Sequence, residues 1–178
     1  MYDLTFLLLE AEKANTDTTS FTVTLIDDDN FFRETLRDYL LSMNIRKIEM
    51  YESGEDFLAK MGDDEKRLVI LDYDFGPKSK YDGMGVLDEI RKRNKKIPII
   101  MLSAQDNMSI ALETLRRGAV DYFIKGNQST YTSVLSSILK INEIQRLRKA
   151  QREYMITGLI GATIFVGLVL WAYVKYTS

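Results

Sequence analysis

The fold is decided by the stretch Leu68-Val69-Ile70-Leu71-Asp72-Tyr73-Asp74. A run of consecutive aliphatic residues predicts a fully buried strand of a parallel sheet, because a half-exposed strand would alternate apolar and polar residues. The run ends at Asp72. In an open α/β sheet, ligands and chemistry gather at the carboxyl ends of the strands, so we predict that Asp72 is the reactive residue.

The composition excludes several kinds of chemistry. The 178 residues are 46% hydrophobic and 28% charged, which is typical of a globular protein. They contain no histidine, which excludes a His-based nucleophile, general base, zinc site or phosphohistidine within them. They contain no cysteine, which excludes disulfides and thiolate metal sites. The formal net charge of −2 gives no global attraction to nucleic acid, and we expect no nucleic-acid partner.

Apolar runs alternate with segments of helical spacing through the first three quarters of the chain. The predicted strands are 21–26, 45–51, 68–72, 97–102 and 120–124. The predicted helices are 31–43, 53–61, 84–93, 107–117 and one that begins near 129. Short links between strands and helices predict βαβ units, and therefore an α/β fold with a doubly wound, five-stranded parallel sheet over residues 21–140.

Polar residues follow most of the predicted strands directly. The first strand is followed by Asp27 and Asp28, the third ends at Asp72, the fourth is followed by Ser103 and the fifth by Lys125. These strand ends face the same way, so the groups can converge. Clustered carboxylates favour Mg²⁺, a carboxylate can attack phosphorus, and a lysine can neutralise a phosphoryl group. The set predicts phosphoryl transfer.

At this point the sequence resembles the receiver domains of two-component response regulators. The resemblance covers about two thirds of the chain, in order and spacing. The matching stretches are Ile26-Asp27-Asp28-Asp29, Leu71-Asp72, Asp82-Gly83, Leu102-Ser103-Ala104 and Gly118-Ala119-Val120-Asp121-Tyr122-Phe123-Ile124-Lys125.

The resemblance implies a flavodoxin-like sheet of strand order 2-1-3-4-5 and a set of roles. Asp72 would accept phosphate from a partner histidine kinase or histidine phosphotransfer protein. Mg²⁺ would be bound by Asp28, Asp72 and the main-chain carbonyl of Asp74, with Asp27 assisting.

Three further roles follow from the same resemblance. Ser103 and Lys125 would hold the phosphoryl group, and Tyr122 would be an aromatic switch that also packs partly in the core.

The sequence departs from the usual receiver pattern at two places. Gly126 stands where receivers usually have proline after the lysine, and the segment between Asp74 and Asp82 is longer than usual. The second departure lies beside the site, where it can alter phosphoryl lifetime or partner access.

The composition shifts near the C-terminal end. Residues 155–174 carry no charge and predict a transmembrane helix. Residues 141–154 predict a basic juxtamembrane helix or linker, and 175–178 a short tail. We assign residues 1–20 to an N-terminal arm without a function. Four basic residues precede the apolar stretch: Arg146, Arg148, Lys149 and Arg152. Because positive residues stay on the cytoplasmic side, they predict a single-pass protein of the cell (inner) membrane with its receiver in the cytoplasm. The same residues could also attract anionic lipid.

Partner contacts of the last helix stay open at this stage. Small-residue spacing, at Gly158 and Ala162 and again at Thr163 and Gly167, allows a homodimer of membrane helices. Ile138, Ile141, Ile144 and Leu147 either extend a seam toward a partner or pack on the sheet.

We therefore expect a membrane-tethered, Mg²⁺-dependent phosphoacceptor rather than a turnover enzyme. Because the residues after the receiver-like part are too few for a DNA-binding module, we expect output by contact with a downstream protein. Two alternatives remain. A pseudo-receiver scaffold would bind partners without phosphate. A dehalogenase-type phosphatase would use Asp72-Tyr73-Asp74, although in that family the acidic pair comes last in the chain and a cap domain is needed.

Overall fold

A computed structural model describes residues 18–62, 66–77, 79–126 and 128–177, without the side chains of 128, 168–170, 172–174 and 177. Residues 1–17, most of the predicted N-terminal arm, lie outside the described part. The chain divides into two compact units, Met1–Asn142 and Glu143–Ser178, which are described separately.

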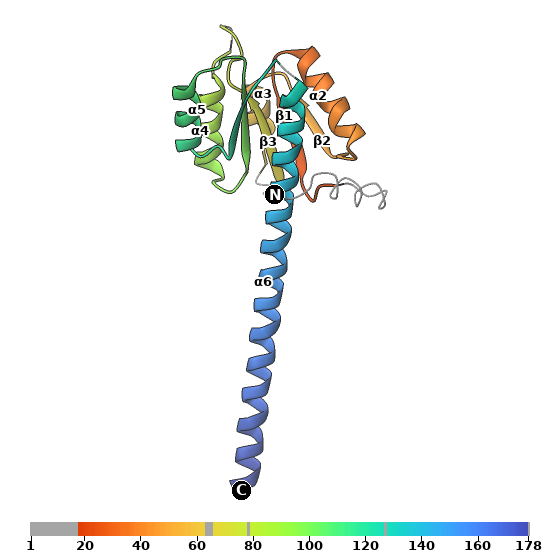
Figure 1. Ribbon diagram of the computed structural model, residues 1–178. Coiled ribbons are helices and arrows are strands. Elements are labelled where there is room, and N and C mark those ends of the chain that lie inside the picture. Colours follow the sequence, from red (N-terminus) through yellow and green to blue (C-terminus); the bar gives the residue numbers. More distant parts are fainter. Residues whose placement is uncertain (1–17, 63–65, 78, 127, 178) are drawn as a thin grey trace. The chain divides into compact units, whose positions relative to one another are not determined.

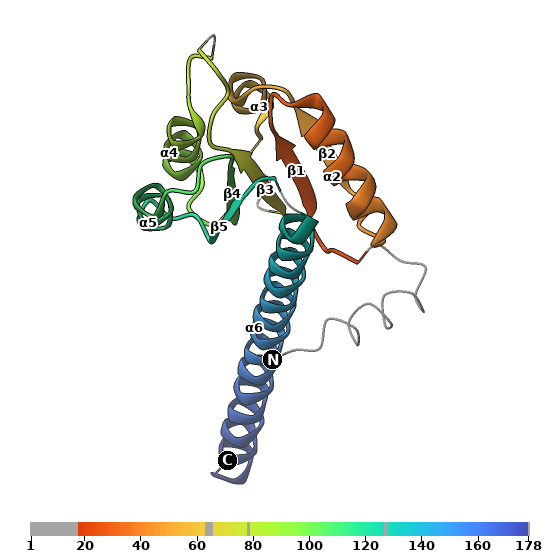
Figure 2. The same cartoon turned by 45° about the horizontal axis from the view of Figure 1, so that its top comes forward.

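The first unit contains a five-stranded parallel sheet of order β2-β1-β3-β4-β5 (Figures 1 and 2). This confirms the doubly wound fold and the strand order that the resemblance implied. The central strand is buried along its whole length, as its aliphatic run predicts. The strands are β1 (Thr22–Ile26), β2 (Ile48–Tyr51), β3 (Arg67–Asp72), β4 (Ile99–Ser103) and β5 (Asp121–Ile124).

The second strand is shorter than predicted. It begins at Ile48 rather than at residue 45, because Asn44 has a φ of 61° and turns the chain there. Ile45, with no exposed surface, packs in the core without joining the sheet. The predicted strand was too long because Ile45 is apolar and buried, and the sequence pattern does not distinguish such a residue from one that pairs in the sheet.

Helices cover both faces of the sheet (Figure 2). Apolar residues of α2 and of the first turns of α6 pack on one face, and those of α3 and α4 pack on the other. The first core therefore joins helices from opposite ends of this unit, whereas the second joins two consecutive helices. The helices are α2 (Asn30–Ser42), α3 (Gly54–Lys60), α4 (Gly83–Arg93), α5 (Met108–Arg116) and α6 (Gln128–Thr177).

The four apolar residues of α6 that were predicted either to pack on the sheet or to face a partner do not all behave alike. Ile138 and Ile141 are buried in the core against the sheet. Ile144 and Leu147, in the second unit, are 38% and 58% exposed. The packing interpretation therefore holds for the first pair only.

The predicted transmembrane helix is not supported by the structure. Residues 155–174 do belong to α6. However, no helix in the described part of the chain combines the length and the apolarity that crossing a membrane requires. The side chains of 168–170 and 172–174, within the predicted span, lie outside that part.

Candidate functional site

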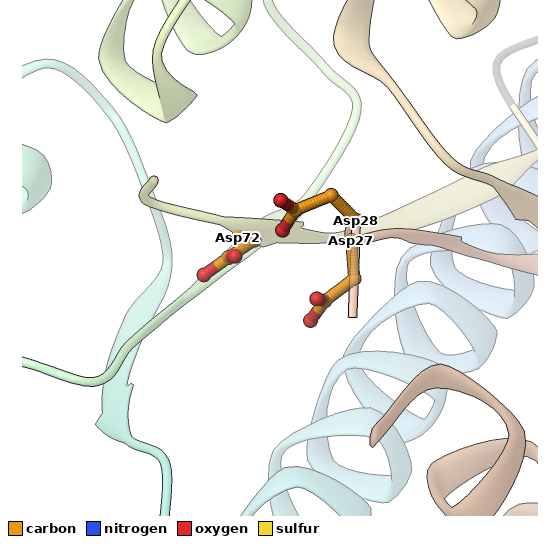
Figure 3. A group of neighbouring side chains, drawn as sticks. All are labelled: Asp27, Asp28 and Asp72. Atoms are coloured by element: carbon orange, nitrogen blue, oxygen red, sulfur yellow. The ribbon is translucent and has the colours of Figure 1, made fainter. Parts of the chain in front are cut away.

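Strand register brings the first two carboxylates together. Ile26 of β1 pairs with Leu71 of β3, so the next residues, Asp27 and Asp72, lie at adjacent strand ends. Asp28 joins them, and one carboxylate oxygen from each of the three aspartates lies within 4.8 Å of the other two (Figure 3). Asp27 and Asp72 are buried, whereas Asp28 is exposed. The cluster thus combines two groups shielded from water with one at the surface.

Lys125 supplies the cation of this cluster. Its Nζ lies 2.7 Å from Oδ2 of Asp27 and 2.9 Å from Oδ1 of Asp72. The ammonium also lies 4.8 Å from the centre of the Phe32 ring, within the range of a cation–π contact. Three carboxylates and one ammonium leave the cluster with a formal charge of −2.

Burial and like charge change the protonation of Asp72. Burial, and then the charge of Asp27, raise its pKa to about 6, against the opposing effect of Lys125. The pKa of Asp27 is also raised by burial, although Lys125 opposes the change. Burial alone would lower the pKa of Lys125, but the two carboxylates outweigh it and raise that pKa. Lys125 therefore stays protonated at neutral pH.

Asp29, the third residue of the acidic run, explains why the other two are available. Its Oδ1 accepts hydrogen bonds from the backbone amides of Phe31 and Phe32, at 2.9 and 3.1 Å, and so caps α2. One acceptor at the N-cap satisfies these amides. Asp27 and Asp28 are therefore not needed as caps of α2, although Oδ1 of Asp27 accepts from the amide of Asp29 at 3.0 Å. A metal-binding role for the pair stays a prediction.

Arg33 is a site neighbour that the sequence did not reveal. It is 8% exposed, and its guanidinium donates to the main-chain carbonyl of Asp27 and, at 2.8 Å, to Oδ1 of Asn30. It thus braces the backbone of the first strand end. Its position within an amphipathic helix pattern gave no signal, because arginine there normally faces solvent.

Ser103 and Lys125 are linked through the backbone of β4 and β5. The amide of Lys125 donates to the carbonyl of Ser103 at 2.7 Å. Ser103 is 1% exposed, and its Oγ accepts from the amide of Gln105 at 3.0 Å. Accepting that bond uses a lone pair and leaves the hydroxyl hydrogen to be donated to a ligand.

Two other predicted site residues lie outside the carboxylate cluster. The hydroxyl of Tyr122 donates to the carbonyl of Gln105 at 2.8 Å, and its half-buried ring packs against the core, as expected. The exposed side chain of Asp74 accepts from the amide of Gly76 at 2.9 Å. The role of its main-chain carbonyl in binding a metal stays a prediction.

The residues present fit Mg²⁺. Magnesium prefers oxygen ligands and is bound in proteins through one or two carboxylates, with water and phosphate oxygens completing the site. Three neighbouring carboxylates provide such ligands, and the net charge of −2 matches a divalent cation. Exposure of Asp28 leaves room for water on one side of the cluster.

Comparisons with known proteins agree with this geometry. Residues 23–135 match the response regulator receiver domain family. The probable C4-dicarboxylate response regulator DctR of Bacillus subtilis is 31% identical over 74% of this chain and 51% of its own length. The transcriptional regulatory protein FixJ of Rhizobium meliloti is 29% identical over 63% of this chain and 53% of its own length. The chain therefore spans about half the length of these relatives.

Solved structures give the same result. The receiver domain of NtrX from Brucella abortus is 28% identical, with a TM-score of 0.59 over 66% of this chain and 98% of that one. A CheY-like receiver domain protein from Methanospirillum hungatei, at 19% identity, has a TM-score of 0.61 over 72% of this chain and 99% of that one. The second similarity shows the fold alone.

Proposed function

The chain belongs to the response regulator receiver domain family, and on that premise we propose that Asp72 accepts a phosphoryl group in a signalling switch. The observation that carries the proposal is the ion-paired cluster of three aspartates and Lys125 at the carboxyl ends of parallel strands. Among the members of this cluster, Asp72 ends the central strand.

The chemistry follows from the state of each group. With a pKa of about 6, the carboxylate of Asp72 is ionised about ten to one at pH 7. One of its oxygens forms the new bond to phosphorus as the bond from phosphorus to the donor breaks, and an acyl phosphate results. Lys125, already 2.9 Å from Asp72, then pairs with the phosphoryl oxygens. The hydroxyl of Ser103 donates to one of them.

We propose that the three carboxylates also hold Mg²⁺. Asp28 and Asp72 would be ligands with the main-chain carbonyl of Asp74, and Asp27 would assist. When bound, the ion neutralises charge that develops on the phosphoryl oxygens. Because Asp27 keeps its ion pair with Lys125, it orients the ammonium toward Asp72.

The phosphoryl donor in this proposal is a phosphohistidine of a histidine kinase or phosphotransfer protein. The 178 residues contain no histidine, so the donor side chain lies outside them. The output is proposed to be a protein contact. The support for it is exposed apolar surface on α5 and just before β5, where Met108, Leu112, Leu115 and Val120 are between 42% and 73% exposed.

Membrane location is a further proposal that rests on the sequence. Its basis is the uncharged stretch 155–174 and the basic residues before it. We expect the full chain to stay in the membrane fraction after an alkaline carbonate wash, with the receiver accessible to protease only from the cytoplasmic side. Release of the chain into the carbonate supernatant would contradict the membrane proposal but leave the phosphoacceptor role proposed for Asp72 unaffected.

Two alternatives predict different behaviour. A pseudo-receiver scaffold would bind its partner equally well with and without phosphate. A dehalogenase-type phosphatase would turn over a small phosphate ester repeatedly, whereas a receiver takes one phosphoryl group. The order of the acidic motifs favours the receiver, because Asp27 and Asp28 precede Asp72.

Beryllofluoride, which imitates an acyl phosphate, tests the proposal. We expect it to bind the full chain with one-to-one stoichiometry only when Mg²⁺ is present. Asp72→Asn should abolish binding, whereas Asp106→Asn, which removes an exposed carboxylate from the loop after β4, should not. Absence of Mg²⁺-dependent binding to the unaltered chain would favour the scaffold.

A further inference from the structure

An open depression adjoins the carboxylate cluster on the side of Asp28. It is walled by that residue, by the turn from β2 into α3, and by the loop from β3 to α4. This loop is the segment that is longer than usual for the family. A longer loop needs contacts with the rest of the fold to hold one conformation beside the depression.

Glu55, at the start of α3, provides that anchor. Its carboxylate accepts from the hydroxyl of Ser79 at 3.2 and 3.1 Å. The same carboxylate accepts from the backbone amides of Lys80 and Tyr81, at 2.5 and 3.3 Å. Burial of Glu55 opposes ionisation, but the hydrogen bond from its own backbone amide and those from the loop outweigh it and lower the pKa of the carboxyl. Glu55 is thus ionised at neutral pH.

The far end of the same loop touches the reactive cluster. The amide of Tyr73 donates to Oδ1 of Asp72 at 2.8 Å, and the carbonyl of Tyr73 accepts from the amide of Gly83 at 2.8 Å. A Cβ placed on Gly76, whose φ is 73°, would lie 3.8 Å from Oδ2 of Asp28. Movement of the loop would therefore change the surroundings of both aspartates.

We propose that Glu55 is a positioning residue that fixes the β3–α4 loop beside Asp28 and thereby sets the lifetime of the phosphoryl group on Asp72. The inference rests on the proposed phosphoacceptor function. Glu55 acts through the loop, which lines one side of the depression and includes the backbone amide that binds Asp72. Without this anchor, water would reach the acyl phosphate more readily.

The test compares Glu55 with Glu52, which lines the same depression. Glu52 is exposed, and among the described residues its carboxylate makes no hydrogen bond to the loop, so Glu52→Ala removes a charge without removing the anchor. The full chain is phosphorylated with acetyl phosphate and Mg²⁺, the donor is removed, and the half-life of the phosphoryl group is measured by intact mass. Glu55→Ala should shorten this half-life about fivefold to tenfold, whereas Glu52→Ala should leave it unchanged.

Two further variants identify the hydrogen bonds as the cause. Glu55→Gln keeps an acceptor oxygen for the amides of Lys80 and Tyr81, and should retain most of the half-life. Ser79→Ala should shorten it slightly in the unaltered chain and have no further effect in Glu55→Ala. A general loss of fold would instead abolish uptake in every Glu55 variant.

The outcomes separate the inference from its premise. A chain that takes up neither phosphate nor beryllofluoride refutes the proposed function, and the role of Glu55 falls with it. Normal uptake with an unchanged half-life in Glu55→Ala overturns the inference alone. So does an equal shortening in Glu52→Ala, because negative charge in the depression would then be the cause.

Discussion

Asp72→Asn should stabilise the metal-free protein, although it removes the reactive group. The carboxyl of Asp72 has a pKa of about 6 in the folded chain, against 3.8 for an unperturbed aspartic acid. A carboxyl whose pKa is raised on folding binds its proton more tightly in the native state. The stability that protonated Asp72 contributes is therefore fully present below about pH 4 and is lost as the pH rises through the window from about 4 to about 6.

The size of the effect follows from the two pKa values. Ionisation of Asp72 reduces the free energy of unfolding by about 3 kcal/mol at pH 7 and by about 0.5 kcal/mol at pH 4. Screening by solvent is small, because Asp72 is only 5% exposed. The favourable pairing with Lys125 is already included in the raised pKa. Asparagine has the shape of the protonated acid and cannot ionise, so it should recover most of this difference.

The assay is urea unfolding of the full chain in chelator, followed by near-ultraviolet circular dichroism at several pH values. The difference between Asp72→Asn and the unaltered chain should grow from pH 4 to pH 7. Added Mg²⁺ should reduce this stability difference. A ligand that binds the native state stabilises it, and the unaltered chain, which keeps all three carboxylates, should bind Mg²⁺ more tightly than Asp72→Asn. Asp106→Asn should show neither effect. A destabilised Asp72→Asn at pH 7, or a difference independent of pH, would refute the reasoning.

Three further substitutions test how the site is held. Gly83→Ala should prevent folding or displace the strand end, because the added Cβ would lie 2.2 Å from the main-chain oxygen of Asp72. A folded variant that binds beryllofluoride normally would contradict this. Asp29→Ala should lower the free energy of unfolding by about 1 kcal/mol through loss of the α2 cap while phosphorylation of Asp72 continues. Ser103→Ala should weaken beryllofluoride binding about tenfold, in keeping with the loss of one charge-assisted hydrogen bond, and an unchanged affinity would place Ser103 outside the site.

The sequence predicted the sheet and the cluster because both depend on simple patterns. An unbroken aliphatic run identifies a central parallel strand, and the parallel arrangement places Asp27, Asp72 and Lys125 at one edge. The positions of these groups need no knowledge of side-chain packing. They follow from where each strand ends.

Other features depend on contacts that no local pattern encodes. Ile45 has the composition of a strand residue, yet the turn at Asn44 excludes it from β2. Arg33 and Glu55 are charged residues near helix N-termini, and ordinary patterns assign such residues to solvent. Only the folded chain reveals that one braces the backbone of Asp27 and the other holds the loop beside Asp28.

The most direct test of the central claim is the intact mass of the full chain after incubation with acetyl phosphate. The account predicts a gain of one phosphoryl group that requires Mg²⁺, is absent in Asp72→Asn and persists in Asp106→Asn. Phosphorylation that survives in Asp72→Asn would contradict the account, and so would uptake that is independent of Mg²⁺.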